Sequence, residues 1–161
     1  MATPQLICQF RVKAANAVSV LVFPRTLLYV MERPMDRLFV SSGGFIGDAN
    51  KSMRQDKAQQ RIEEAVRRVQ DQVGADRFDA PTAAARLRDE GLEVKAIGSD
   101  EVTGITLSRA SVFASGMPKL RFARVRGLAT VFYVQWPRAD LDRLAAAMTT
   151  AFGAKFTHQA L

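Results

Sequence analysis

Cysteine and histidine are scarce in this sequence. Among its 161 residues there is one cysteine, Cys8, and one histidine, His158. A single cysteine cannot close an internal disulfide, so the fold does not depend on an oxidising compartment. Cys8 stands in the strand-like stretch QLICQFRV, where a small buried hydrophobe is a commoner role than a reactive thiol. His158 stands near the end of the sequence, which is a poor place for a general base.

Long apolar segments and phosphate-binding glycine motifs are also missing. The longest apolar runs, AVSVLVF and TLLYVM, have the length of strands and are too short to cross a membrane. No apolar segment follows a basic start in the manner of a signal peptide. SSGGFIG matches neither common nucleotide-binding pattern, and no cysteine or histidine cluster has metal-ligand spacing. We therefore expect a soluble, cytoplasmic protein with no metal and no cofactor, and we favour binding over catalysis.

Acidic residues are absent from a long basic segment in the second half of the chain. The net charge is +7, and residues 102–161 contain eight lysines and arginines against two acids. Residues 48–101, by contrast, contain ten basic and twelve acidic residues. Such uneven charge favours an anionic partner. The acid-free segment lies between Glu101 and Asp140 and contains Arg109, Lys119, Arg121, Arg124, Arg126 and Arg138.

The pattern of apolar residues predicts a single domain, 1–161, with two groups of strands separated by helices. The first strand group contains the short runs LICQFRV, AVSVLVF, TLLYVM and RLFV, which are rich in β-branched and aromatic residues. The second contains LEVKAI, VTGITLSR and a hairpin that turns at Arg126-Gly127. The first strand group, a helical insertion, the second strand group and a C-terminal helix occupy residues 1–47, 48–91, 92–136 and 137–153.

The first predicted helix begins at Ser52, where Ser52 and Gln55 have the spacing of a capping box, and ends at Gly74. Its apolar stripe is narrow, which suits a helix packed on one surface. That surface is either the rest of the domain or a second copy of the chain. The stripe consists of Ile62, Val66, Val69 and Val73.

Two further helices have clear boundaries in the sequence. The second helix is expected from Pro81 to Glu90, with Asp79 as its N-cap and Gly91 as its terminator. The C-terminal helix is amphipathic and ends at Gly153. Its apolar face consists of Leu141, Leu144, Ala145, Met148 and Phe152.

The segment EVTGITLSRASVFASGMPKLRFARVRGLATVFYVQWPRADLDRLAAAM resembles the C-terminal half of bacterial pleckstrin-homology-like (PH-like) and GRAM-like domains. There a strand, a basic loop, a hairpin and a closing helix follow one another, and the first strands of this chain fit the pattern loosely. The resemblance implies an α+β fold, either a PH-like antiparallel barrel or a strongly bent sheet, with a C-terminal capping helix and a two-helix insertion. The first strand pair carries only Arg11 and Lys13, so phosphoinositide recognition does not follow from the resemblance.

The basic segment is the predicted binding site. We expect a non-catalytic binding module that engages a partner protein or an anionic membrane surface, with Phe113 and Met117 as apolar contacts. Each cation near an anionic membrane contributes about 1 kcal/mol, so five contribute at most about 5 kcal/mol. The predicted ligand-binding residues are Arg109, Lys119, Arg121, Arg124 and Arg126.

Three alternatives stay open on the sequence alone. A nucleic-acid-binding protein would use the same strands, with Phe122 and Tyr133 facing outward to stack on bases. A structural homodimer would associate through the helix at residues 54–73. The basic strand would otherwise be solvated surface whose alternate residues are core.

Overall fold

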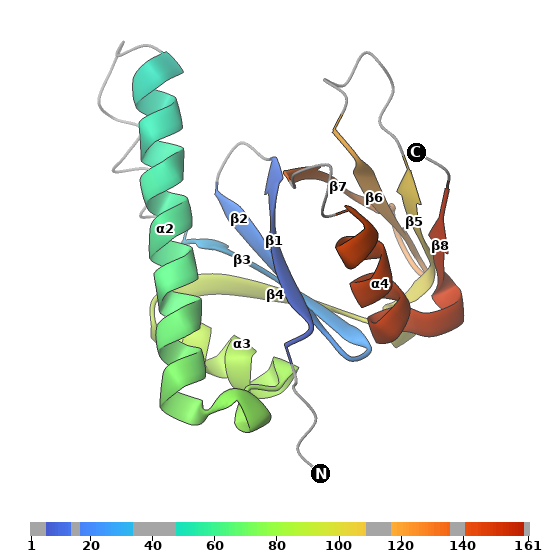
Figure 1. The fold of residues 1–161 in the computed structure, drawn as a ribbon, viewed down its shortest axis with the longest axis horizontal. Helices are drawn as coiled ribbons and strands as arrows, with labels where there is room; N and C mark the ends of the chain where they lie inside the picture. The colour runs from blue at the N-terminus through green and yellow to red at the C-terminus, as the bar shows by residue number, and fades with distance from the viewer. Residues whose placement is uncertain (1–5, 14–16, 34–47, 109–116, 136–140, 160–161) are drawn as a thin grey trace.

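A single mixed sheet organises the chain in a computed structural model that describes residues 6–13, 17–33, 48–108, 117–135 and 141–159 (Figure 1). Eight strands within these ranges pair in the order β4-β3-β2-β1-β7-β6-β5-β8. All neighbours are antiparallel except β5 and β8, which run parallel. The strands are β1 (Cys8–Lys13), β2 (Val18–Phe23), β3 (Thr26–Glu32), β4 (Leu92–Gly98), β5 (Val102–Ser108), β6 (Lys119–Arg124), β7 (Thr130–Gln135) and β8 (Phe156–His158).

Three α-helices pack on this sheet in the described ranges, and they lie on opposite faces. They are α2 (Asp48–Val73), α3 (Ala80–Asp89) and α4 (Leu141–Phe152). Helix α4 lies in the hollow between the two halves of the bent sheet, whereas α2 and α3 lie beside the half formed by β1 to β4 (Figure 1). The strand order ends at β4 and β8, so the sheet is open. The predicted α+β class is confirmed, in its bent-sheet form and not as a closed barrel.

The α4 face of the sheet holds one hydrophobic core. Alternate residues of β1, β2, β5, β6 and β7 point to this face, because successive side chains of a strand lie on opposite sides. Leu144 and Met148 of α4 are fully buried among them. All five residues of the predicted apolar face of this helix are buried, which confirms that prediction. The core includes Phe10, Val12, Val20, Leu107, Leu120, Phe122 and Val134.

The opposite face holds a second core under α2 and α3. Ile62, Val66 and Val69 of α2 are buried there against the outward residues of β2, β3 and β4. Every residue of β2 is buried, since helices cover this strand from both sides. The apolar stripe of α2 therefore packs on the rest of its own domain, which is the first of the two surfaces predicted for it.

The start of α2 was predicted wrongly. The helix begins at Asp48, so Ser52 lies inside it and no capping box at Ser52 starts it. The stretch DANK has no apolar periodicity, but alanine and lysine are good helix formers and an acid at the first turn suits the helix dipole. At 26 residues the helix is about 39 Å long, and its N-terminal part projects beyond the sheet (Figure 1).

Two other local signals are confirmed, the cap at Asp79 and the glycine turn at Gly127. Asp79 caps α3 by accepting a hydrogen bond of 2.9 Å from the Thr82 backbone N, and hydrogen bonds from Thr82 lower the pKa of the Asp79 carboxyl. Gly127 adopts a φ of +85° in the predicted hairpin turn, a conformation that side chains other than glycine rarely adopt. The predicted strand RLFV at residues 37–40, and the residues between β7 and α4, lie outside the described residues.

Candidate binding surface on the β6–β7 hairpin

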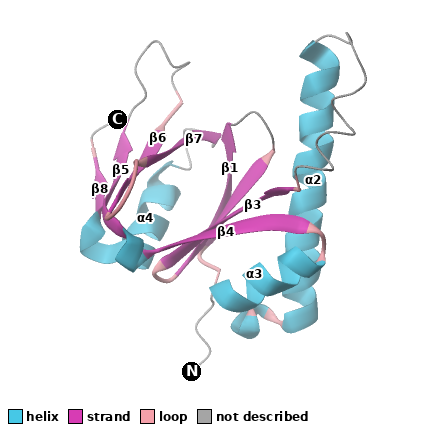
Figure 2. Cartoon of the chain, turned by 180° about the vertical axis from the view of Figure 1, so that it is seen from behind, coloured by secondary structure: helices cyan, strands magenta, loops and turns pink. Residues whose placement is uncertain are grey.

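Helices α2 and α3 cover only half of their face of the sheet. In the described ranges no helix packs on that face over β5, β6 and β7, which lie on the other side of β1 (Figure 2). Cross-strand register places one set of side chains on this uncovered area, which we call the open face. The open face includes Thr106, Ser108, Lys119, Arg121, Val131, Tyr133 and Gln135.

A bidentate ion pair marks the border between the covered area and the open face. Arg11 of β1 lies opposite Gln135 in the sheet, and its Nε and Nη2 donate to the two carboxylate oxygens of Glu63 at 2.6 and 2.9 Å. The hydrogen bond from Arg11 lowers the pKa of the Glu63 carboxyl. Beneath this pair the buried side chains of Gln59 and Ser19 are hydrogen-bonded. This polar chain holds α2 in place beside the open face.

Basic and apolar side chains stand opposite each other on the open face. Lys119 pairs with Tyr133 and Arg121 pairs with Val131 across β6 and β7. The Arg121, Val131 and Tyr133 side chains are exposed, and Lys119 is half-buried. None of these four residues is acidic, so the hairpin presents cations beside apolar surface. A surface of this kind suits an anionic partner that also offers an apolar layer.

The turn between β6 and β7 also combines exposed apolar side chains with a cation. Leu128 is 94% exposed and Val125 is 56% exposed, with the exposed Arg126 between them in the chain. The backbone N of Val125 donates to the Glu101 carbonyl oxygen at 2.9 Å, which holds the start of the turn against the 3-10 helix η2 (Ser99–Glu101). We call residues 125–128 the hairpin tip.

The predicted cations that the structure describes do not all lie on the same side of the hairpin. Arg121 and Lys119 lie on the open face and Arg126 lies at the tip, but Arg124 points to the opposite side of β6. Its Nη2 lies 3.6 Å from Glu101 Oε1, and its Nη1 donates to Thr130 Oγ1 at 3.4 Å. Arg124 therefore joins the hairpin to η2 and presents little free charge.

Of the two predicted apolar contacts, only Met117 lies in the described residues. Met117 is half-buried before β6, while Arg109 and Phe113 lie outside the described residues. Val125, Leu128 and Val131 were missed. The signal was present at the tip, where apolar residues flank a glycine turn, but β7 is apolar on both faces and its pattern does not show which side is exposed.

Cys8 is not an activated nucleophile. Burial is the larger influence and raises the pKa of its thiol to about 12, against the opposing charge of Arg143. The nucleophilic thiolate is then scarce at neutral pH. The side chain is half-buried against the α4 core, in keeping with its predicted packing role.

Alkylation tests this assignment. At neutral pH Cys8 in the folded protein is expected to react with a small maleimide or iodoacetamide at least about tenfold more slowly than a free thiol, since its pKa lies well above the ordinary range. Mass spectrometry over time measures the rate, and unfolding in denaturant should restore it. A folded-state rate equal to that of the unfolded chain contradicts the prediction.

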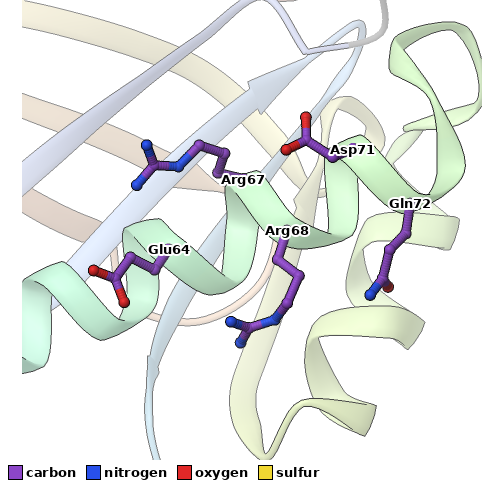
Figure 3. Close-up of a pocket in the computed structure, with 5 residues that line it drawn as sticks. All are labelled: Glu64, Arg67, Arg68, Asp71 and Gln72. Atoms are coloured by element: carbon purple, nitrogen blue, oxygen red, sulfur yellow. The ribbon is translucent and has the colours of Figure 1, made fainter.

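A shallow depression on α2 is open to solvent and is not an enclosed pocket. Its volume is about 500 Å³, and its side chains all come from this one helix (Figure 3). Arg68 is engaged by Glu90 at 2.7 Å. The described residues contain no group of three or more histidine, cysteine, aspartate or glutamate side chains able to hold a metal ion. The lining residues are Glu64, Arg67, Arg68, Asp71 and Gln72.

Comparison with known proteins assigns no family. Neither a scan against protein-family models nor a search of curated proteins found a match to this chain. Among the helices of the described ranges, none is both long and apolar enough to span a bilayer. The open face and the hairpin tip are the surfaces of the described chain that combine cations with exposed apolar side chains.

Proposed function

We propose that the protein is a PH-like, non-catalytic binding module of the cytoplasm that engages an anionic partner surface through the β6–β7 hairpin. The observation that supports this proposal is the outward placement of Lys119, Arg121 and Arg126 on one hairpin without an acid between them. Within the described part of the chain none of the three forms an ion pair. Their charge is available to a partner, unlike that of Arg124.

Charge alone gives weak binding. Three cations at about 1 kcal/mol each contribute about 3 kcal/mol at an anionic membrane. That free energy corresponds to a dissociation constant weaker than about a millimolar. A useful affinity needs contacts beyond charge, and the exposed Val131 and Tyr133 lie directly opposite the cations to supply them.

A charge-matched pair of variants tests the proposal. The triple substitution Lys119→Ala, Arg121→Ala and Arg126→Ala is expected to weaken binding to anionic vesicles about 100-fold at low salt. Co-sedimentation with phosphatidylserine-containing and with neutral phosphatidylcholine vesicles measures this loss. A single-stranded oligonucleotide and an acidic peptide serve as further anionic probes, read by fluorescence anisotropy.

The control removes the same charge elsewhere. Arg67, Arg77 and Arg86 are exposed on or near α2 and α3, away from the hairpin, and their replacement by alanine should change binding less than about threefold. Circular dichroism confirms that both variants are folded. If the hairpin variant binds every anionic probe as well as the control does, the hairpin is not the binding site.

A further inference from the structure

Exposed apolar side chains are concentrated on one hairpin. Five large hydrophobic residues are exposed in the described ranges, and four of them belong to residues 119–135. Two lie on the open face and two at the hairpin tip. The fifth, Met53, lies on α2. The four are Val125, Leu128, Val131 and Tyr133.

The exposure of the hairpin tip favours a lipid bilayer over a folded protein as its partner. Leu128 is 94% exposed, so almost none of its surface is covered by the rest of the described chain. A protruding apolar tip needs a matching pocket on a protein partner, but it enters a bilayer interface without one. The start of the tip is also already held by the Val125 to Glu101 backbone hydrogen bond, which lowers the cost of ordering it on insertion.

Two cations lie at or near the hairpin tip. Arg126 belongs to the tip itself, and Arg121 stands four residues before Val125, or about 13 Å back along the strand. Apolar side chains of interfacial segments lie about 5–10 Å into the boundary between headgroups and acyl chains. Arg121 then lies at the level of the anionic headgroups when Leu128 lies in the acyl region.

The acids nearest the tip do not cancel this charge. Glu101 accepts a hydrogen bond of 2.7 Å from the Gly98 backbone N and pairs with Arg124. Asp100 is exposed beside Gly98 in the same turn and carries one negative charge. Arg121 and Arg126 outnumber it, and Lys119 adds a third positive charge farther along β6.

We infer that the β6–β7 hairpin is a membrane anchor that inserts Leu128 and Val125 into the interface of an anionic bilayer, with Arg121 and Arg126 at its headgroups. This inference depends on the proposed function and deepens it by naming the partner as lipid. Binding of the same hairpin to an acidic protein or to a nucleic acid is the competing outcome of the test.

Replacement of Leu128 tests insertion of the tip without changing the charge of the hairpin. Leu128→Ser is expected to weaken binding to phosphatidylserine-containing vesicles roughly tenfold or more, since burial of a leucine side chain in the bilayer is lost. The thermal midpoint should stay that of the wild type because the side chain packs on almost nothing. Met53→Ser removes an exposed apolar residue from α2 and should leave vesicle binding unchanged.

A label at the same position reports depth directly. In Leu128→Cys the new thiol is exposed, whereas Cys8 is half-buried with a raised pKa, so a maleimide-linked polarity-sensitive dye attaches at residue 128. The dye emission is expected to shift to the blue on anionic vesicles and to be quenched by lipids spin-labelled in the acyl chain. No shift on bound vesicles overturns insertion.

The outcomes separate the two proposals. Loss of vesicle binding in Leu128→Ser and in the triple cation variant supports the charged binding site and the insertion of the tip. Wild-type affinity in Leu128→Ser with loss in the triple variant overturns insertion and leaves the charged binding site standing. Hairpin-dependent binding to the oligonucleotide or the acidic peptide, without binding to vesicles, overturns the lipid assignment alone. Unchanged binding of the triple variant to every probe overturns both.

Discussion

Phe122→Ala is expected to lower the free energy of unfolding by about 3–5 kcal/mol, the usual cost of removing a buried phenylalanine. Phe122 has no exposed surface, and its ring meets those of Phe132 and Phe152 edge to face at centroid distances of 5.8 and 6.3 Å. It therefore joins β6, β7 and α4 in one core. Chemical denaturation followed by circular dichroism measures the loss.

Tyr133→Ala is the matched control for Phe122→Ala. Tyr133 lies on the open face of the adjacent strand and is 36% exposed, so its loss should cost less than about 1 kcal/mol. This comparison bears on the nucleic-acid alternative, which requires both rings to face outward. Phe122 faces the core instead, and that part of the alternative is wrong. Equal stability losses in the two variants would contradict the assignment of their sides.

Val66→Asp should prevent stable folding at room temperature. The Val66 side chain is 1% exposed in the core beneath α2, where a carboxylate has no cationic partner among the neighbouring apolar residues. Placement of an unpaired charge in such a core costs more than about 4 kcal/mol, a large part of the stability of a small domain. Gln60→Asp puts the same side chain at an exposed position of α2 and should leave the protein folded.

The same variant bears on the predicted homodimer. If the Val66 stripe were an interface between copies, Val66→Asp would give a folded monomer, detectable by light scattering after size exclusion. The structure buries the stripe under the chain's own sheet, so an unfolded or aggregated product is expected. A homodimer through α2 stays a prediction, and it would have to use the polar side of the helix.

The arrangement of the sheet explains how one hairpin becomes available for binding. Helix α4 fills the hollow between the two halves of the sheet, while α2 and α3 protect the opposite face over β2 to β4 only (Figures 1 and 2). β6 and β7 are thus packed on one side, through Leu120, Phe122 and Val134, and uncovered on the other. A hairpin with one packed and one solvated side presents its cations and apolar residues on the same exposed surface.

The sequence by itself determined the elements whose signals are local. The cap at Asp79, the glycine at residue 91 after α3 and the glycine turn at Gly127 each depend on backbone conformation within a few residues. The apolar face of α4 was predictable because helical periodicity repeats across adjacent turns. The first four residues of α2 carried no such periodicity and were missed.

Only the tertiary structure decided which side of each element is free. The pairing of β1 with β7 joins strands from opposite ends of the chain, and the short β8 forms by pairing with β5, so neither follows from local pattern. β7 is apolar on both faces, and its exposed side was set by where α4 packs and where α2 stops. Val131 and Tyr133 therefore gained a candidate binding role through long-range packing, because burial of an apolar residue depends on which distant elements reach it.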